Sequence, residues 1–181
     1  MNDSKAIFVG GIHGVGKTEV CELLSKEFKL EILSASSLLN WDSSSQNKIN
    51  KTVSNIDKNQ HRLIELLNSN SITEKVYILD GHFCLLNAKF QIECIDFSIF
   101  KEINPLIIIV KTENPEIIKK RLFQRDAINY DIDLILKIQN EEIRYAYNIS
   151  KKLNIPFFTL NSEKIKTLVG TLTPIIADYI K

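Results

Sequence analysis

The sequence of 181 residues has few cysteines, no long apolar run and no basic leader, and each shortage excludes a class of protein. The three cysteines, Cys21, Cys84 and Cys94, form no C-x-x-C pair, which argues against a zinc site and predicts free thiols in a reducing compartment. No apolar run approaches the roughly 18 residues that span a bilayer. We therefore expect a soluble cytoplasmic protein that does not enter a membrane.

Charge of neither sign is in excess. Lys and Arg number 23 against 22 Asp and Glu, so the net charge is +1 and no overall field would attract nucleic acid. Arginine itself is rare and occurs only at Arg62, Arg121, Arg125 and Arg144. Because its planar fork holds phosphate through two hydrogen bonds, these positions are candidates for phosphate contacts.

Glycine is scarce except in one stretch, since four of the six glycines lie in residues 10–16. The surrounding sequence, AIFVGGIHGVGKTEV, satisfies G-x-x-x-x-G-K-[ST] between an apolar strand and a helix predicted over residues 17–28. Glycines let successive backbone N–H groups surround a polyphosphate, and the helix N-terminus presents its positive dipole end to the same anion. A chance glycine turn is the disfavoured alternative.

The motif gives its last two positions specific roles. Lys17 is predicted to neutralise the outer phosphates, and the hydroxyl of Thr18 is predicted to hold Mg²⁺. The predicted nucleotide-binding set in this stretch is Gly11, His13, Gly14, Val15, Gly16, Lys17, Thr18 and Glu19.

Strand-like runs alternate with helical patterns along the whole chain. The runs lie at residues 6–9, 31–33, 76–79, 106–110 and 157–160. This alternation predicts a parallel sheet covered by helices on both faces, in one α/β domain over residues 1–181.

A second signal is VYILDGH, which describes a buried strand with Asp80 at its C-terminal edge. Open α/β sheets bind ligands at this edge, so Asp80 is predicted to orient Mg²⁺, directly or through water, or the nucleophile. A helix cap or a turn residue is the alternative for Asp80. For His82 a hydrogen-bonded structural role and a role at the acceptor site remain equally open.

The region between the second and third strands is predicted to form the acceptor side, with helices at about residues 35–70. Trp41, at the entrance to the polar loop at residues 42–47, is either a packing anchor or a platform on which an acceptor ring stacks. Residues 83–95 are expected to form a small hairpin, with a short helix at 97–103, and carry no assigned chemistry.

The second half of the chain carries the arginines. Asn114 is predicted to cap a helix on which Arg121 and Arg125 share one face, and Arg144 lies on a following helix at residues 132–153. Three arginines on two helices joined by a polar loop predict a small lid at about residues 121–144 that closes over a polyphosphate. A solvated charged face is the alternative.

The C-terminal part is predicted to form a helix. Ser162 is expected to cap this helix, and Pro174 is expected to break or kink it. The turn at residues 160–162 is expected to place its backbone near the nucleotide base.

The motifs GIHGVGKT, ILDGH and RLFQR, with Arg144 following, resemble the adenylate kinase-like branch of the P-loop kinases, closest to members with a short lid that lacks zinc-binding cysteines. The resemblance implies a three-layer fold with a five-stranded parallel sheet of order 2-3-1-4-5, and ATP with Mg²⁺ as cofactors. It also implies that Arg121 packs on adenine, that Arg125 reaches the transferred phosphoryl group and that Arg144 acts from the far side of the lid. The implied catalytic set is Lys17, Asp80, Arg121, Arg125 and Arg144.

The acceptor side departs from this pattern. The stretches SASSLLNW and DGHFCLLN lack the arginines with which family members grip an acceptor phosphate. Lys48, Lys51, His61 and Arg62 are the candidate substitutes. A hydroxyl acceptor, such as a nucleoside or a related metabolite, fits the missing cations better than a nucleoside monophosphate, with Asp80 as the base or orienting group.

Two functions follow from these observations. The first is a kinase that transfers the γ-phosphoryl group of ATP to a small-molecule acceptor. The alternative is a regulatory NTPase that acts on a macromolecular partner and has no small acceptor. A kinase that modifies nucleic acid is disfavoured by the neutral charge balance.

Overall fold

The centre of the molecule is a five-stranded parallel sheet. The computed structural model describes residues 4–39, 46–47, 52–53, 56–69, 75–87, 89 and 91–180. The strands of this sheet are β1 (Lys5–Gly10), β2 (Ile32–Ser34), β5 (Val76–Asp80), β8 (Pro105–Lys111) and β9 (Phe157–Leu160). They lie in the order β2-β5-β1-β8-β9, all neighbours parallel. Numbered along the chain, these strands run 2-3-1-4-5, which confirms the predicted fold.

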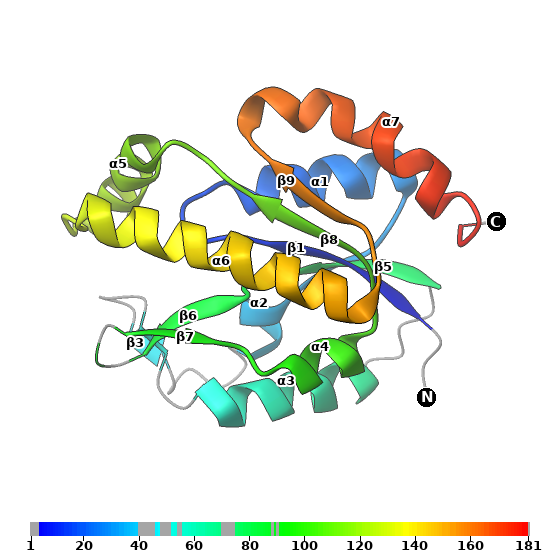
Figure 1. Cartoon of the computed structure of the whole chain (residues 1–181), viewed down its shortest axis with the longest axis horizontal. Helices are drawn as coiled ribbons and strands as arrows, with labels where there is room; N and C mark the ends of the chain where they lie inside the picture. Colours follow the sequence, from blue (N-terminus) through cyan, green and yellow to red (C-terminus); the bar gives the residue numbers. More distant parts are fainter. Residues whose placement is uncertain are drawn as a thin grey trace.

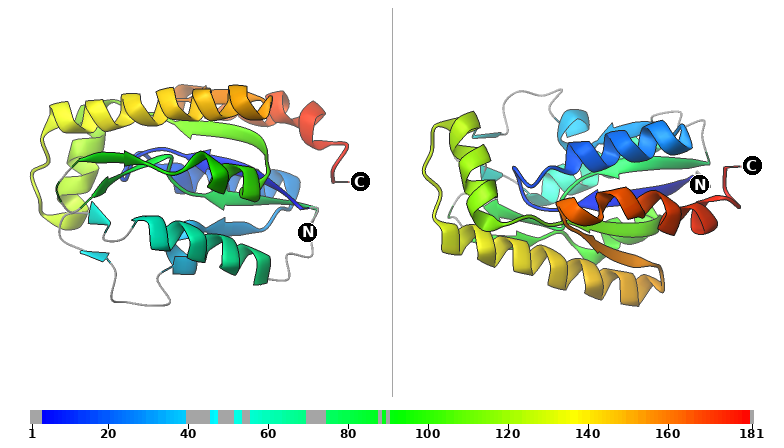
Figure 2. Two further views of the ribbon diagram at one scale, coloured as in Figure 1. Left: turned by 60° about the horizontal axis from the view of Figure 1, so that its bottom comes forward. Right: turned by 90° about the horizontal axis from the view of Figure 1, so that it is seen from above.

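Helices cover both faces of the sheet (Figures 1 and 2). One face is covered by α1 (Lys17–Phe28) and α7 (Ile165–Ile176), and the other by α3 (Ile56–Ser69), α4 (Phe97–Ile103) and α6 (Ile132–Leu153). Alternate residues of β1 supply the two cores, since Ile7 packs with the α1/α7 layer and Phe8 with the α3/α4/α6 layer. The sheet is therefore buried on both sides, as its continuous apolar strands require.

The helices of the second half begin at capping side chains, of which Asn114 was predicted. Asn114 accepts a hydrogen bond from the N–H of Glu116 and opens α5 (Pro115–Asp126), with proline in the first helical position. Asp131 caps α6 in the same way. In the part of the chain that the structure describes, no helix combines the length and apolarity needed to cross a bilayer.

The described residues form a second, smaller sheet. It contains β3 (Gln46–Asn47), β4 (Thr52–Val53), β6 (Cys84–Asn87) and β7 (Ile92–Cys94), in the order β3-β4-β6-β7. The β6–β7 hairpin and α4 confirm the expectation for residues 83–103. The strand β4 corrects part of the helical prediction for residues 35–70, because the β-branched pair Thr52–Val53 lies alongside β6. Trp41, Lys48 and Lys51 lie outside the described residues.

The hairpin also corrects the prediction of three free thiols. Cys84 and Cys94 stand opposite each other in the β6–β7 register and are joined by a disulfide. Cys21 is a free buried thiol, as predicted. The pairing depends on the strand register, which the spacing of the cysteines does not reveal.

The start of the last helix differs from prediction. The side chain of Asn161, not that of Ser162, accepts the N–H of Lys164 and opens the 3-10 turn η1 (Ser162–Lys164) before α7. The short helix α2 (Ala35–Leu39) directly follows β2. Helix α7 is not broken at Pro174, because it continues to Ile176.

Candidate active site

The loop between β1 and α1 requires glycine at three positions. Gly11, Gly14 and Gly16 have φ values of 138°, 77° and 97°. A Cβ atom on Gly11 would lie 2.6 Å from the backbone oxygen of Lys111, and one on Gly14 would lie 3.0 Å from the side chain of Leu122. The loop therefore folds tightly, with backbone N–H groups and the N-terminus of α1 available to an anion.

A cleft of about 320 Å³ opens above this loop, at the C-terminal edge of the sheet. Its lining includes the loop together with Ser36, Asp80 and His82. Arg121 and Arg125 line it from α5. The structure thus brings residues from four separate parts of the sequence around one space.

Lys17 is held inside the loop by its own backbone. Its Nζ donates to the carbonyl oxygens of Gly11 at 2.8 Å and Ile12 at 3.3 Å, and lies 4.0 Å from Oδ1 of Asp80. Burial lowers the pKa of this ammonium, and the charge of Asp80 opposes that shift. An incoming phosphate would offer the ammonium stronger charged acceptors than two carbonyl oxygens.

Asp80 and Thr18 line the same cleft but belong to different elements, a strand and a helix. Asp80 is the last residue of β5, paired in register with Val9 of β1, and Thr18 lies in the first turn of α1. Burial raises the pKa of Asp80, although Lys17 opposes this shift. A hydroxyl and a carboxylate are the hard oxygen ligands that Mg²⁺ takes, so this donor set fits a magnesium ion.

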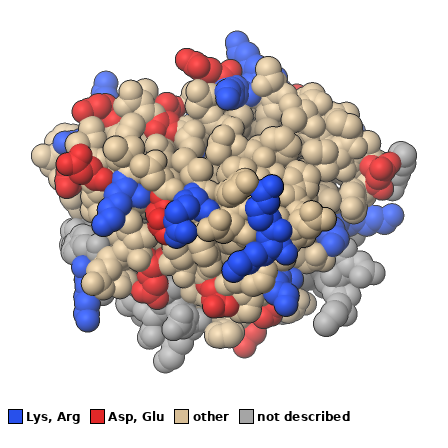
Figure 3. Space-filling view, in the orientation of Figure 1, with Lys and Arg blue, Asp and Glu red and all other residues tan. Residues whose placement is uncertain are grey.

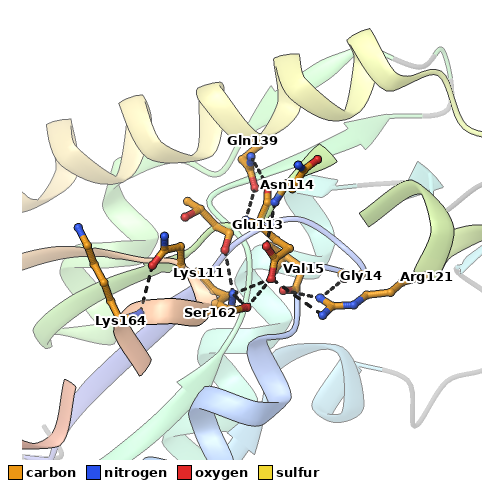
Figure 4. Close-up of polar contacts among 11 residues, drawn as sticks. Gly14, Val15, Lys111, Glu113, Asn114, Arg121, Gln139, Ser162 and Lys164 are labelled. Carbon is orange, nitrogen blue, oxygen red and sulfur yellow. Dashed lines mark hydrogen bonds and ion pairs between the residues drawn. The ribbon is translucent and has the colours of Figure 1, made fainter. Parts of the chain in front are cut away.

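The three predicted lid arginines do not behave alike. Arg121 points at the loop, where its Nη1 donates to the backbone oxygens of Val15 at 3.2 Å and Gly14 at 3.4 Å (Figure 4). Arg125, one turn later, lines the cleft. Arg144 does not line it; its exposed guanidinium is paired with Glu141 on its own helix. The catalytic role of Arg144 stays a prediction.

Other predicted residues take varied positions. His13 lines the cleft. The side chain of Val15 is buried against Ile118 and Leu122 and does not line the cleft. Glu19 is exposed on α1 and is not among the lining residues. The candidate acceptor cations His61 and Arg62 are exposed on α3 and also do not line the cleft.

Sequence reasoning missed a buried carboxyl group behind the cleft. Glu142 on α6 is fully buried, and its Oε2 accepts the N–H of Phe83 at 3.0 Å. Its Oε1 has no hydrogen-bond partner and lies 3.4 Å from Nδ1 of His82. Burial raises the pKa of Glu142 to about 7 and lowers that of His82. The detectable signal was an acidic residue on the apolar face of an amphipathic helix.

A second missed group lies beside Arg121 (Figure 4). Lys111 is fully buried at the end of β8; its Nζ donates to Oγ of Ser162 at 3.1 Å and lies 3.6 Å from Oε2 of Glu113. Ser162 donates to this carboxylate, and Nη2 of Arg121 lies 4.0 Å from it. Gln139 holds the backbone of Glu113 through two hydrogen bonds of 3.0 Å. The network fixes Arg121 relative to β8, α6 and the turn after β9.

The sequence of this chain matches one known protein family. The sequence model of a family described as an AAA domain matches residues 10–139, which include the glycine-rich loop, Asp80 and both arginines of α5. The chain belongs to the AAA domain family. This AAA domain protein has no match among curated proteins.

Solved structures share the fold of this AAA domain protein over nearly its whole length. A shikimate kinase from Acinetobacter baumannii, in complex with shikimate, has 13% identity and a TM-score of 0.57, and the match covers 99% of this chain and 97% of that one. A gluconokinase from Sinorhizobium meliloti has 11% identity and a TM-score of 0.58, with 98% and 94% covered. The YorR protein from Bacillus subtilis, in complex with phosphorylated GDP, has 19% identity and a TM-score of 0.54, with 93% and 95% covered. The fold is therefore that of the P-loop kinases.

Proposed function

We propose that the protein is a P-loop kinase that transfers the γ-phosphoryl group of ATP to the hydroxyl of a small molecule. The observation that carries the proposal is the convergence of Lys17, Asp80, Arg121 and Arg125 on one cleft above a glycine-rich loop. The names of the structural neighbours, gluconokinase and shikimate kinase, support a small acceptor.

The chemistry rests on positioning and charge neutralisation. The loop N–H groups hold the phosphates, and Lys17 exchanges the carbonyls of Gly11 and Ile12 for phosphate oxygens. Thr18 and Asp80 would hold Mg²⁺, directly or through water, and the ion supplies further neutralisation of phosphate charge when bound. Arg125 faces the transferred group from α5.

Asp80 also acts on the acceptor in the proposed mechanism. Its carboxylate lies at the C-terminal edge of β5, where it orients the acceptor hydroxyl and takes up the proton as the new bond forms.

The finer assignment is the adenylate kinase-like branch with a short lid. Helices α5 and α6 and their connection, about residues 121–144, are the proposed lid, and residues 1–181 are the proposed single domain. The tie between Arg121 and the loop carbonyls supports an α5 that closes toward the phosphates.

The proposal is tested by an ATP-consumption screen over nucleosides, nucleoside monophosphates and sugars. We expect ADP formation that depends on one acceptor class and is lost in Lys17→Ala and Arg125→Ala, with unchanged circular dichroism. Equal turnover in both variants and the wild type would exclude this kinase mechanism.

The alternative is a regulatory NTPase acting on a macromolecular partner. It is favoured by the match to a family described as an AAA domain and by the additional sheet on the acceptor side. Stimulation of turnover by a macromolecule alone would support it. On the face shown in Figure 3, basic and acidic side chains of the described residues are interspersed, so nucleic acid is not the favoured partner.

A further inference from the structure

A second pocket adjoins the cleft, and its lining is apolar. It has a volume of about 50 Å³ and is lined by Leu85 and Leu86 of β6, by Leu134 and Ile138 of α6 and by Tyr130. It shares three residues with the cleft, Ile12, His13 and His82. The two spaces therefore meet at the histidine pair, whose ring centroids lie 4.3 Å apart.

Among the described residues that line the two spaces, the lysines and arginines all lie on one side of this junction. Lys17, Arg121 and Arg125 line the cleft, and no lysine or arginine in the described ranges lines the apolar pocket. Behind His82 stands a carboxyl group, Glu142, with an unpartnered oxygen. A phosphate in this pocket would meet no opposing charge, and burying an unpaired charge is costly.

From this contrast, and resting on the proposed kinase function, we propose that the acceptor is an uncharged alcohol with a compact apolar group. Its hydroxyl lies in the cleft near Asp80, and its apolar group, a branched alkyl chain or a small ring, fills the pocket between β6 and α6. The hydroxyl oxygen forms a bond to the γ-phosphorus of ATP while the bond from that phosphorus to the bridging oxygen breaks. The electron pair leaves with ADP, and the hydroxyl proton passes to Asp80.

The dimensions narrow the class of acceptor. A cavity of about 150 Å³ lined by aliphatic and aromatic side chains accepts benzene, so a pocket of about 50 Å³ suits a smaller group and excludes a purine. Each buried methylene is worth roughly a fourfold gain in affinity until the pocket is full. A homologous series of alcohols should therefore bind more tightly with size and then weaken abruptly.

The direct test is a binding titration of the full chain, followed by amide NMR, with isobutanol as the apolar probe and glycerol 3-phosphate as the charged probe. Isobutanol is expected to give saturable shifts at Leu85, Leu134 and Ile138. Leu134→Gln is expected to weaken this binding roughly tenfold. Leu136→Gln, at a position on the same helix that is 44% exposed and does not line the pocket, is the control and should change it less than twofold. Equal weakening in the two variants, no saturable shift, or binding of glycerol 3-phosphate at these residues would overturn the inference.

A nucleotide arm separates this inference from the proposed function. Calorimetry with ATP and Mg²⁺ should give the same affinity in Leu134→Gln as in the wild type, because the substitution lies outside the phosphate loop. If a phosphorylated or purely polar acceptor stimulates ADP formation and Leu134→Gln leaves its KM unchanged, the kinase function stands and the apolar acceptor is wrong. If ATP does not bind at all, the proposed function fails, whatever the isobutanol result.

Discussion

The two sides of the cleft are built in opposite ways. The donor side consists of contiguous residues, 11–18, whose shape follows from glycines with positive φ and from the start of one helix. The proposed acceptor side is assembled from the segment after β5, from β6 and from the first two turns of α6, which lie far apart in the sequence. The donor side is cationic and the adjoining pocket is apolar. Phosphate chemistry is thus encoded locally, whereas the choice of acceptor depends on tertiary packing.

The largest effect should come from the donor side. Lys17→Ala removes the cation nearest the phosphates and is expected to lower turnover about 100- to 1,000-fold. Lys26→Ala, at an exposed position near the end of the same helix, should leave turnover within twofold. The steady-state rate of ADP formation measures the turnover of both variants. Similar turnover in Lys17→Ala and Lys26→Ala would contradict a cationic donor side.

A glycine pair tests the claim that the loop backbone shapes the donor side. Gly11→Ala is expected to abolish nucleotide binding and to lower the free energy of unfolding by about 1–3 kcal/mol, because its Cβ would meet the oxygen of Lys111 at a φ of 138°. Gly170→Ala, in α7 with open space around it, should raise that free energy by about 0.5–1 kcal/mol. Urea unfolding and nucleotide titration report the two quantities; a stable, nucleotide-binding Gly11→Ala would refute the argument.

Glu142 tests the buried chemistry behind the acceptor side. Because its pKa is raised from 4.5 to about 7 in the folded state, the folded protein binds more protons than the unfolded chain between these values. The wild type should therefore lose on the order of 3 kcal/mol of unfolding stability from pH 4.5 to pH 7 relative to Glu142→Gln, which lacks this titration. The lowered pKa of His82 acts in the opposite direction in the wild type, so the difference between the two proteins is the informative quantity. Parallel stability curves from pH 4.5 to 8 would contradict the assignment.

The smallest effect is expected at Arg144. Its guanidinium is exposed and paired with Glu141 on α6, away from the cleft lining. Arg144→Ala should change turnover less than threefold, whereas Arg125→Ala should lower it at least tenfold, and neither should shift the thermal midpoint measurably. A large loss of turnover in Arg144→Ala would instead support the catalytic role predicted for Arg144 from the sequence.

The sequence was sufficient for the features that depend on neighbouring residues. The glycine-rich loop, the boundaries of α1 and α6 and the cap at Asn114 all rest on local rules, and the structure has them where predicted. It was insufficient where a side chain acts across the fold. The Cys84–Cys94 pairing depends on strand register, and Ser162 turns from its predicted capping role to Glu113.

The buried charged groups were missed for a related reason. Glu142 contacts Phe83 and His82, and Lys111 donates a hydrogen bond to Ser162, so the partners of each group lie many residues away in the sequence. A charged residue in an apolar run signals that a partner is needed but does not identify it. Predicting the acceptor side therefore requires the packing of α6 against β6, which no local pattern specifies.

The central claim is that residues 11–18 hold the triphosphate tail of a nucleotide against one ammonium group. Titration calorimetry of the wild type with ATP at millimolar Mg²⁺ tests this most directly. The account predicts a micromolar dissociation constant for the wild type and no detectable heat for Lys17→Ala. The absence of heat with both ATP and GTP in the wild type, or an unchanged dissociation constant in Lys17→Ala, would contradict it.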